Sequence, residues 1–166
     1  TSKSSVADAA YDNDIVVLKQ VRRFFDFIPL NNTDKSPTIK VYDSINRSES
    51  SLDTLIPQNP NTPYDMRELI LKIADENDFF EIQKEFAKNI LVGFIRISGS
   101  TVGVVANQPM VLAGCLDIDS SRKAARFVRF CDAFEIPILT FVDVPGFLPG
   151  TSQEYGGVIK HGAKLL

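Results

Sequence analysis

Apolar side chains recur at helical spacing over the first part of the chain. Between residues 5 and 28 they return every three or four positions, as Val17, Phe24 and Ile28 illustrate. Pro29 follows, and proline disfavours continuation of a helix because it has no backbone N–H. The pattern therefore predicts an amphipathic helix over residues 5–28.

Asparagine, serine, aspartate and proline then dominate residues 30–62, where apolar stretches such as residues 39–42 stay short. This composition is typical of a loop or an interdomain linker. After Pro63, Asp65 and Glu68 have the spacing of a capping box. A second helix, and with it a new domain, is predicted to begin there. Its apolar face consists of Met66, Leu69, Ile70 and Ile73.

Two apolar runs, residues 90–97 and 101–106, flank the turn residues 98–100 and predict a hairpin or two adjacent, partly buried strands. Residues 119–121 (Asp-Ser-Ser) then have the chemistry of a helix N-cap, and Pro137 marks the exit of that helix. The hairpin thus leads into an amphipathic helix. Its apolar stripe consists of Ala124, Phe127, Val128, Cys131 and Phe134.

Residues 138–142 are almost continuously apolar, which is typical of a parallel strand covered on both faces. A loop rich in glycine and proline follows over residues 145–152, and a final helix is predicted from about Gln153. The order β-β-α-β-α places the chain in the α/β class. No stop signal accompanies Leu166, so we expect the sequence to be an excerpt that ends within a helix.

The composition narrows the function classes. The 166 residues are 44% hydrophobic and 23% charged, as in an ordinary globular domain. Eighteen Lys and Arg against 21 Asp and Glu give a net charge of −3, with no basic stripe suited to nucleic acid or an acidic membrane. The sequence shows neither a membrane-spanning apolar run nor a signal-peptide profile, so we expect a soluble intracellular protein.

Cys115 and Cys131 are too few and too far apart for a zinc knuckle or a C-x-x-C redox pair, so we expect buried free thiols and no metal site. Asp117 and Asp119 could attract a divalent cation, but carboxylates at a helix start are favoured by the helix dipole, which makes capping the better interpretation. His161, the sole histidine, lies on a predicted helix without an obvious nucleophile or metal partner, which disfavours a general-base role.

The loop over residues 143–155 is the best candidate for a site. Ligands of α/β sheets bind beyond the carboxyl ends of the strands. Unpaired N–H groups beside a helix N-terminus bind anions, including an oxyanion that develops during a reaction. Thr151 and Ser152 can cap the helix that follows. A plain strand-to-helix turn explains the same residues equally well.

Two catalytic classes are disfavoured by their motifs. A Ser-His-Asp hydrolase needs an elbow such as G-x-S-x-G, which the sequence lacks. Residues 143–146 match the D-x-x-G element of GTP-binding proteins, and residues 157–162 have the G-x-x-x-x-G spacing of a phosphate loop. Ala163 stands where the essential lysine must follow, so a GTPase is a weak interpretation.

A longer match is more specific than these motifs. Residues 141–157 (FVDVPGFLPGTSQEYGG) and 160–166 (KHGAKLL) resemble the signature of carboxyltransferase β subunits of biotin-dependent acyl-CoA carboxylases, the propionyl-CoA carboxylase type. The resemblance covers essentially the whole chain and is weakest over residues 30–62. It extends to residues 1–8, 64–66, 106–109, 114–118 and 125–134.

The resemblance implies two crotonase-like domains in the full subunit, each built from repeated β-β-α units. Residues 1–29 would form the helical C-terminal tail of the first domain, residues 30–62 the linker, and residues 63–166 the N-terminal part of the second domain. The β-β-α-β order of residues 90–143 agrees with this architecture.

The resemblance also implies the reaction, in which CO2 passes from carboxybiotin, held on a partner's carrier domain, to propionyl-CoA and gives methylmalonyl-CoA. Backbone N–H groups would stabilise the oxyanions. The implied partners are an acyl-CoA, the biotin carboxylase and carrier α subunit, and further β subunits in a hexameric core, with no nucleic acid and no membrane. The implied compartment is the cytoplasm of a bacterium or the mitochondrial matrix of a eukaryote.

By position, the resemblance assigns a biotin-side oxyanion hole and a wall of the acyl or biotin pocket to the candidate loop and the helix after it. Because the family's CoA site belongs to the first domain, we expect this chain to be inactive alone. The alternative is a non-catalytic crotonase-like interaction module. The oxyanion residues are Gly146, Phe147, Gly150 and Thr151, and the pocket residues are Tyr155, Gly156 and Gly157.

Overall fold

The computed structural model describes residues 2–165. At its centre lies a four-stranded sheet in the order β1-β2-β3-β4, in which the first three strands are antiparallel and β4 runs parallel to β3. The strands are β1 (Phe80–Ile82), β2 (Ile90–Ile97), β3 (Ser100–Asn107) and β4 (Ile138–Phe141).

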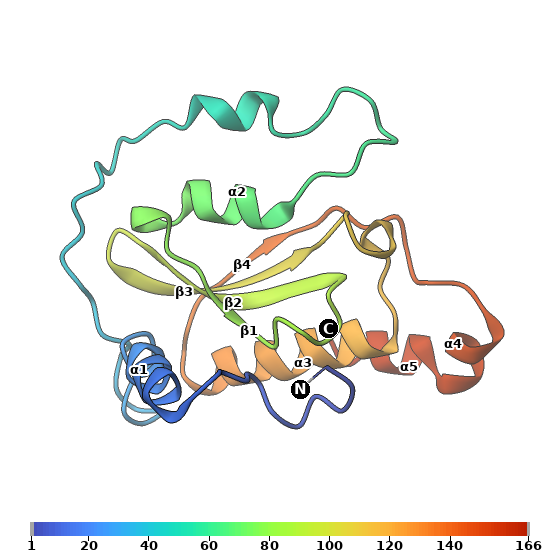
Figure 1. Cartoon of the computed structure of the whole chain (residues 1–166), viewed down its shortest axis with the longest axis horizontal. Coiled ribbons are helices and arrows are strands. Elements are labelled where there is room, and N and C mark those ends of the chain that lie inside the picture. Colours follow the sequence, from blue (N-terminus) through green and yellow to red (C-terminus); the bar gives the residue numbers. More distant parts are fainter. Residues whose placement is uncertain (1, 166) are drawn as a thin grey trace.

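Helices cover both faces of this sheet (Figure 1). α2 lies over one face, and α3 lies under the other face with α1 beside it. The segment between α1 and α2 arches over α2 and contains a single short 3-10 turn, Ser50–Thr54. The helices are α1 (Asp14–Phe25), α2 (Met66–Ile73), α3 (Ile118–Ala133), α4 (Thr151–Gly156) and α5 (Val158–Gly162), and further 3-10 turns are Asp75–Asn77 and Leu112–Gly114.

The predicted hairpin is confirmed, since β2 and β3 pair along their whole length. Ser98 and Gly99 connect them with φ values of 52° and 79°, the left-handed conformation that a two-residue hairpin turn favours. β1 was not predicted, because a strand of three residues is too short to show a two-residue period. It adds a strand at the edge of the sheet, beside β2.

Two apolar clusters enclose the sheet. On the α3 face, the ring of Phe94 lies 6.0 Å from that of Phe27 and 5.1 Å from that of Phe127, measured between centroids. On the α2 face, Met66 and Ile70 pack against the strands. All five side chains are at most 5% exposed. The segment after α1 therefore contributes directly to the core beneath the sheet.

α1 is shorter than the helix predicted over residues 5–28. The prediction is wrong at its start because the side chain of Asn13 accepts a hydrogen bond from the N–H of Val16 at 3.0 Å and caps the helix. The apolar stripe is also divided. Phe24 packs against the core beneath the sheet, whereas Leu18 on the other side of α1 is 65% exposed.

The capping interpretation of Asp117 is confirmed, whereas the predicted cap of α3 at residues 119–121 is wrong, because Asp117 caps the helix. Its carboxylate accepts a hydrogen bond from the N–H of Ser120, and the hydroxyl of Ser120 accepts one from the N–H of Asp117, both at 2.8 Å. This reciprocal pair is a capping box. Asp119 lies in the first turn, where the helix dipole favours a carboxylate.

The predicted cap of α2 is confirmed in part. Asp65 accepts a hydrogen bond from the N–H of Arg67 at 2.9 Å, as an N-cap does. Glu68 forms an ion pair with Lys72 at 3.5 Å on the next turn of the helix, and the reciprocal bond of a capping box is not among the contacts of residues 2–165. The predicted start of α2 is correct, but only the side chain of Asp65 caps the helix, without the reciprocal bond from Glu68.

β4 is parallel to β3 as predicted, but only one of its faces is covered. Leu139 and Phe141 pack against the cluster on the α2 face. Ile138 and Thr140, which alternate with them, are exposed. The prediction of a strand buried on both faces is wrong because β4 is the outermost strand and α3 packs under β2.

Candidate active site

A chain of hydrogen bonds fixes the point where the candidate loop leaves β4. The hydroxyl of Tyr64 donates to Oδ2 of Asp143 at 2.7 Å, and the N–H of Asp143 donates to Oδ1 of Asn107 at 3.3 Å. Nδ2 of Asn107 donates in turn to the carbonyl of Gly114 at 3.0 Å. Burial and the bond to Asp143 raise the pKa of Tyr64 to about 12, so the phenol stays a donor at neutral pH.

The same loop is tied to the segment that precedes α3. The N–H of Leu116 donates to the carbonyl of Gly146 at 3.0 Å, and the N–H of Leu148 donates to the carbonyl of Leu116 at 2.8 Å. Together these bonds form a parallel bridge between Leu116 and Phe147. Two loops distant in sequence are therefore held together beyond the end of β4.

The four predicted oxyanion residues lie in this loop and at the start of α4. Gly146 and Gly150 have φ values of 150° and 135°, and a Cβ built on either would meet no atom within 4 Å. Within residues 2–165, the N–H groups of Gly146, Phe147, Gly150 and Thr151 have no hydrogen-bond acceptor. Unpaired donors are what an oxyanion hole requires, and their assignment to that role stays a prediction.

The side chain of Phe147 anchors the loop on α5. A Cβ added to Gly162 would lie only 2.5 Å from the Phe147 ring, so the absence of a side chain at Gly162 allows this close packing. Phe147 remains 42% exposed. Its side chain therefore has a packing role, while its N–H has no acceptor in residues 2–165.

The single final helix predicted from Gln153 is instead two short helices. α4 begins two residues earlier, and Gly157, with φ 81° and ψ 47°, separates α4 from α5. Tyr155 on α4 is 92% exposed. Gly156 faces α3, where a Cβ would lie 2.5 Å from Cδ1 of Ile118. Gly156 thus serves close helix packing, and the predicted pocket wall at residues 155–157 stays a prediction.

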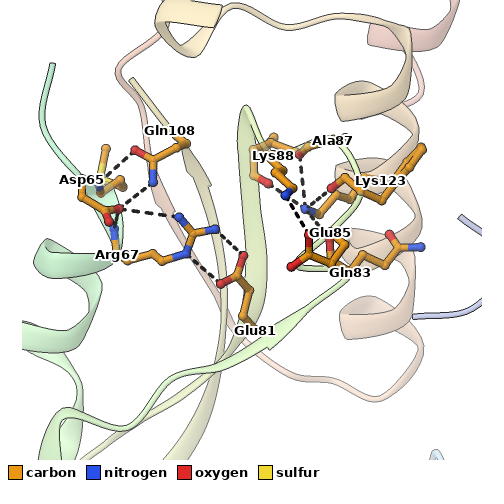
Figure 2. A network of polar contacts seen from close by, with 12 residues as sticks. Asp65, Arg67, Glu81, Gln83, Glu85, Ala87, Lys88, Gln108 and Lys123 are labelled. Carbon is orange, nitrogen blue, oxygen red and sulfur yellow. Dashed lines mark hydrogen bonds and ion pairs between the residues drawn. The ribbon is translucent and has the colours of Figure 1, made fainter. Parts of the chain in front are cut away.

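Figure 2 shows a polar network that was not predicted. Lys123 on α3 is 2% exposed, and its ammonium donates to four backbone carbonyls of the turn between β1 and β2. Burial lowers the pKa of Lys123 to about 8, which still leaves it charged at pH 7. The distances are 3.0 Å to Gln83, 2.8 Å to Phe86, 3.3 Å to Ala87 and 2.8 Å to Ile90.

The other half of the network joins α2 to the sheet. Arg67 donates two hydrogen bonds of 2.8 Å to the carboxylate of Glu81 in β1, a bidentate ion pair. Glu81 raises the pKa of Arg67 through these bonds. Asp65 accepts from Nε2 of Gln108 at 2.6 Å. Helix α2 is therefore fixed against β1 and against the end of β3.

The two cysteines and His161 form no metal site in the part of the chain that the structure describes. Cys131 is buried as predicted, whereas Cys115 is only partly buried, so the prediction of two buried thiols is wrong for Cys115. Nδ1 of His161 is buried without a hydrogen-bond partner in residues 2–165. In that part of the chain no cluster of His, Cys, Asp and Glu is suited to a metal ion, and no helix is long and apolar enough to cross a membrane.

Cys131 is expected to react with a small alkylating agent only after the protein unfolds. It is 0% exposed, and burial raises the pKa of its thiol to about 12, so the folded protein offers neither access nor thiolate at about pH 8. Peptide mass spectrometry after labelling with and without urea checks this, with the partly buried Cys115 as the internal reference. Equal labelling of both thiols in the native protein would contradict it.

The carboxyl transferase domain family matches residues 1–166. The chain therefore belongs to this family, and its α/β architecture is the crotonase-like fold. Transcarboxylase 12S, solved as a hexamer with hydrolysed methylmalonyl-coenzyme A bound, superposes with a TM-score of 0.95 and 41% identity over 98% of this chain and 32% of the other.

Two curated relatives with high identity share one name. The propionyl-CoA carboxylase beta chain of Roseobacter denitrificans is 75% identical over the whole chain. The mitochondrial propionyl-CoA carboxylase beta chain of Sus scrofa is 58% identical over the same residues. The chain spans about a third of the length of these relatives, 32% and 31% respectively.

Proposed function

We propose that this chain is part of the carboxyltransferase component of a biotin-dependent acyl-CoA carboxylase, which transfers CO2 from carboxybiotin to propionyl-CoA and forms methylmalonyl-CoA. The observation that carries the proposal is the 75% identity to a propionyl-CoA carboxylase beta chain over all 166 residues, the candidate loop included. The chain alone is expected to be inactive, because it spans only 32% of that relative.

The chemistry needs anion stabilisation more than a titrating side chain. Carboxybiotin supplies the CO2 unit: its N–C bond breaks, a C–C bond forms at the α-carbon of the thioester, and the α-proton passes to the ureido nitrogen. Negative charge develops on the ureido oxygen when the N–C bond breaks, before the ureido nitrogen accepts the proton. The unpaired N–H groups of Gly146, Phe147, Gly150 and Thr151 would stabilise this charge.

The domain division belongs to this proposal. Residues 1–29 would end a first carboxyltransferase domain, residues 30–62 would link the domains, and residues 63–166 would begin the second. The proposed partners are the biotin carboxylase and carrier α subunit and other β subunits in a hexameric core. The relatives include bacterial and mitochondrial proteins, which supports a cytoplasmic location in a bacterium and a matrix location in a eukaryote.

Neither alternative has a supporting observation of its own. An interaction module needs no unpaired N–H groups beyond β4, so it leaves the open loop unexplained. A GTPase needs a phosphate loop at residues 157–162, but residues 158–162 form α5, and Gly162 packs under the Phe147 ring. Residues 158–162 therefore pack as a helix and do not form a phosphate-binding loop.

The proposal is tested by carboxyl transfer in a full-length subunit that contains this sequence. The subunit is combined with its biotin-carboxylating partner, ATP and bicarbonate, and product is measured with acetyl-, propionyl- and butyryl-CoA. Product chiefly from propionyl-CoA is expected. A folded complex that carboxylates none of the three thioesters would leave the interaction module as the better explanation.

Replacing Tyr64 with phenylalanine is expected to lower kcat of carboxyl transfer about fivefold, since the hydrogen bond that fixes Asp143 is worth about 1 kcal/mol. The Michaelis constant for propionyl-CoA should not change, because Tyr64 acts through the loop on the biotin side. Tyr42→Phe is the matched control, since Tyr42 is 83% exposed. Equal kcat values in the two variants would show that the bond does not position the loop.

A further inference from the structure

An apolar cavity of about 260 Å³ lies under the sheet, between β1, β2 and α3, and shares no residue with the candidate loop. Its wall includes four phenylalanine rings, those of Phe24, Phe94, Phe127 and Phe130. The side chains of Phe94 and Phe127 belong to the core and are at most 5% exposed. An engineered apolar cavity of about 150 Å³ binds benzene, so this cavity can hold an apolar group of roughly six to ten carbons.

The apolar cavity has a charged rim. Arg126 of α3 and Asp8 belong to its lining, and their side chains are 53% and 45% exposed, so the cavity meets solvent there. Nη1 and Nη2 of Arg126 donate to the two carboxylate oxygens of Asp8 at 2.9 and 3.1 Å. This bidentate geometry is the one in which arginine binds a carboxylate. The rim is therefore chemically suited to a carboxylate, and Asp8 occupies one part of it.

A second pocket, of about 190 Å³, adjoins this rim and shares Gln83, Lys123 and Arg126 with the apolar cavity. None of the Asp and Glu side chains of residues 2–165 lines it. Basic side chains dominate its lining instead, namely Arg122, Lys123, Arg126, Arg129 and Lys164. An apolar cavity and a basic pocket are therefore continuous along one side of α3.

The charges of the basic pocket are only partly neutralised. Arg122 pairs with Asp119 at 3.4 Å, whereas Arg129 and Lys164 form no ion pair with any of residues 2–165. The ammonium of Lys123 spends its hydrogens on backbone carbonyls, but it is 2% exposed, so solvent screens its charge little. The pocket therefore has an excess of positive charge that a bound anion would offset.

We propose that the cavity and the basic pocket form one site for a medium-chain carboxylate, an anion with an apolar chain of about eight carbons. The chain lies among the phenylalanine rings. The carboxylate lies on Arg129, which follows Arg126 by three residues and is its neighbour on the surface of α3. Burial of the chain supplies affinity, and the basic pocket selects a negative head group. The site is separate from the candidate loop and does not depend on carboxyl transfer.

Isothermal titration calorimetry of a full-length subunit that contains this sequence tests the site directly. Octanoate is the probe, 1-octanol supplies the chain without the charge, and acetate supplies the charge without the chain. Saturable binding of octanoate is expected, with 1-octanol and acetate each at least about tenfold weaker. Absence of saturable octanoate binding would overturn the proposal. Binding of 1-octanol as tight as that of octanoate would overturn it as well, because the basic pocket would then select nothing.

Two variants test the two halves of the site. Arg129→Gln removes the unpaired cation and should weaken octanoate about fivefold while leaving 1-octanol unchanged. Phe130→Trp places a larger ring in the cavity and should weaken both ligands about tenfold. Arg22→Gln, an exposed arginine of α1 outside both pockets, is the matched control and should change neither. Urea denaturation establishes that the variants are folded. Unchanged octanoate affinity in folded Arg129→Gln or Phe130→Trp protein would overturn the proposal, which requires both halves.

Discussion

Replacing Gly150 with proline is expected to reduce carboxyl transfer by about 100-fold or more, the typical cost of losing an oxyanion donor. Gly150 has φ 135° and ψ 148°, a conformation that is essentially restricted to glycine, whereas proline fixes φ near −65°. Proline also removes the N–H of residue 150. Both effects displace the loop at the predicted oxyanion hole.

The defect should appear in kcat and not in the KM for propionyl-CoA, because the thioester site is expected in the first domain. Ser152→Ala is the matched control, since Ser152 is an exposed residue of the first turn of α4 and its conformation accepts alanine. Urea denaturation of both variants establishes that they are folded. Near-normal transfer by folded Gly150→Pro protein would remove the loop from the mechanism.

Replacing Lys123 with methionine is expected to lower the free energy of unfolding by about 2–4 kcal/mol. Methionine fills a similar volume but removes the donor that four carbonyls share. The carbonyls of Gln83 and Ala87 keep a backbone N–H, so chiefly the other two lose a partner, at about 1–3 kcal/mol each. In the wild type, burial of the ammonium costs free energy, as the lowered pKa of Lys123 indicates. The methionine variant avoids this cost, which offsets part of the loss.

Lys88→Met is the control for the same turn. The side chain of Lys88 is 52% exposed and pairs with Glu85 at 2.7 Å, a surface ion pair that contributes little to stability. Urea titration followed by circular dichroism gives both values. Equal stability of the two variants would show that the carbonyls of the turn find water or other donors when the ammonium is absent.

Patterns local in sequence predicted the hairpin, α3 and β4, because each has a period or a turn signal within about ten residues. Lys123 shows where such patterns mislead. It lies one turn before Phe127 and three residues after Ser120, on the buried face of α3, so its place in the stripe was the available signal. Because lysine is rarely fully buried, this position alone does not predict a buried ammonium.

The candidate loop was predicted from its glycines and from its place after β4, but its supports were not. The bond between Tyr64 and Asp143 and the bridge between Leu116 and Phe147 join segments far apart in the sequence. The hydrophobic periodicity of a short stretch of sequence does not indicate which distant segments it contacts. The close packing of Gly156 against Ile118 of α3 could not be predicted either, because it depends on how α4 packs on α3.

The position of Phe27 in the core has a consequence for synthesis of the protein. Phe27 packs on Phe94, which packs on Phe127, so the cluster beneath the sheet closes only when α3 has been made. At roughly 5–20 residues per second, the ribosome adds Phe127 about 5–20 s after Phe27. During that interval Phe80 and Phe94 are made, but the cluster stays open on the side that α3 covers, and the nascent chain presents an apolar surface that a chaperone can bind.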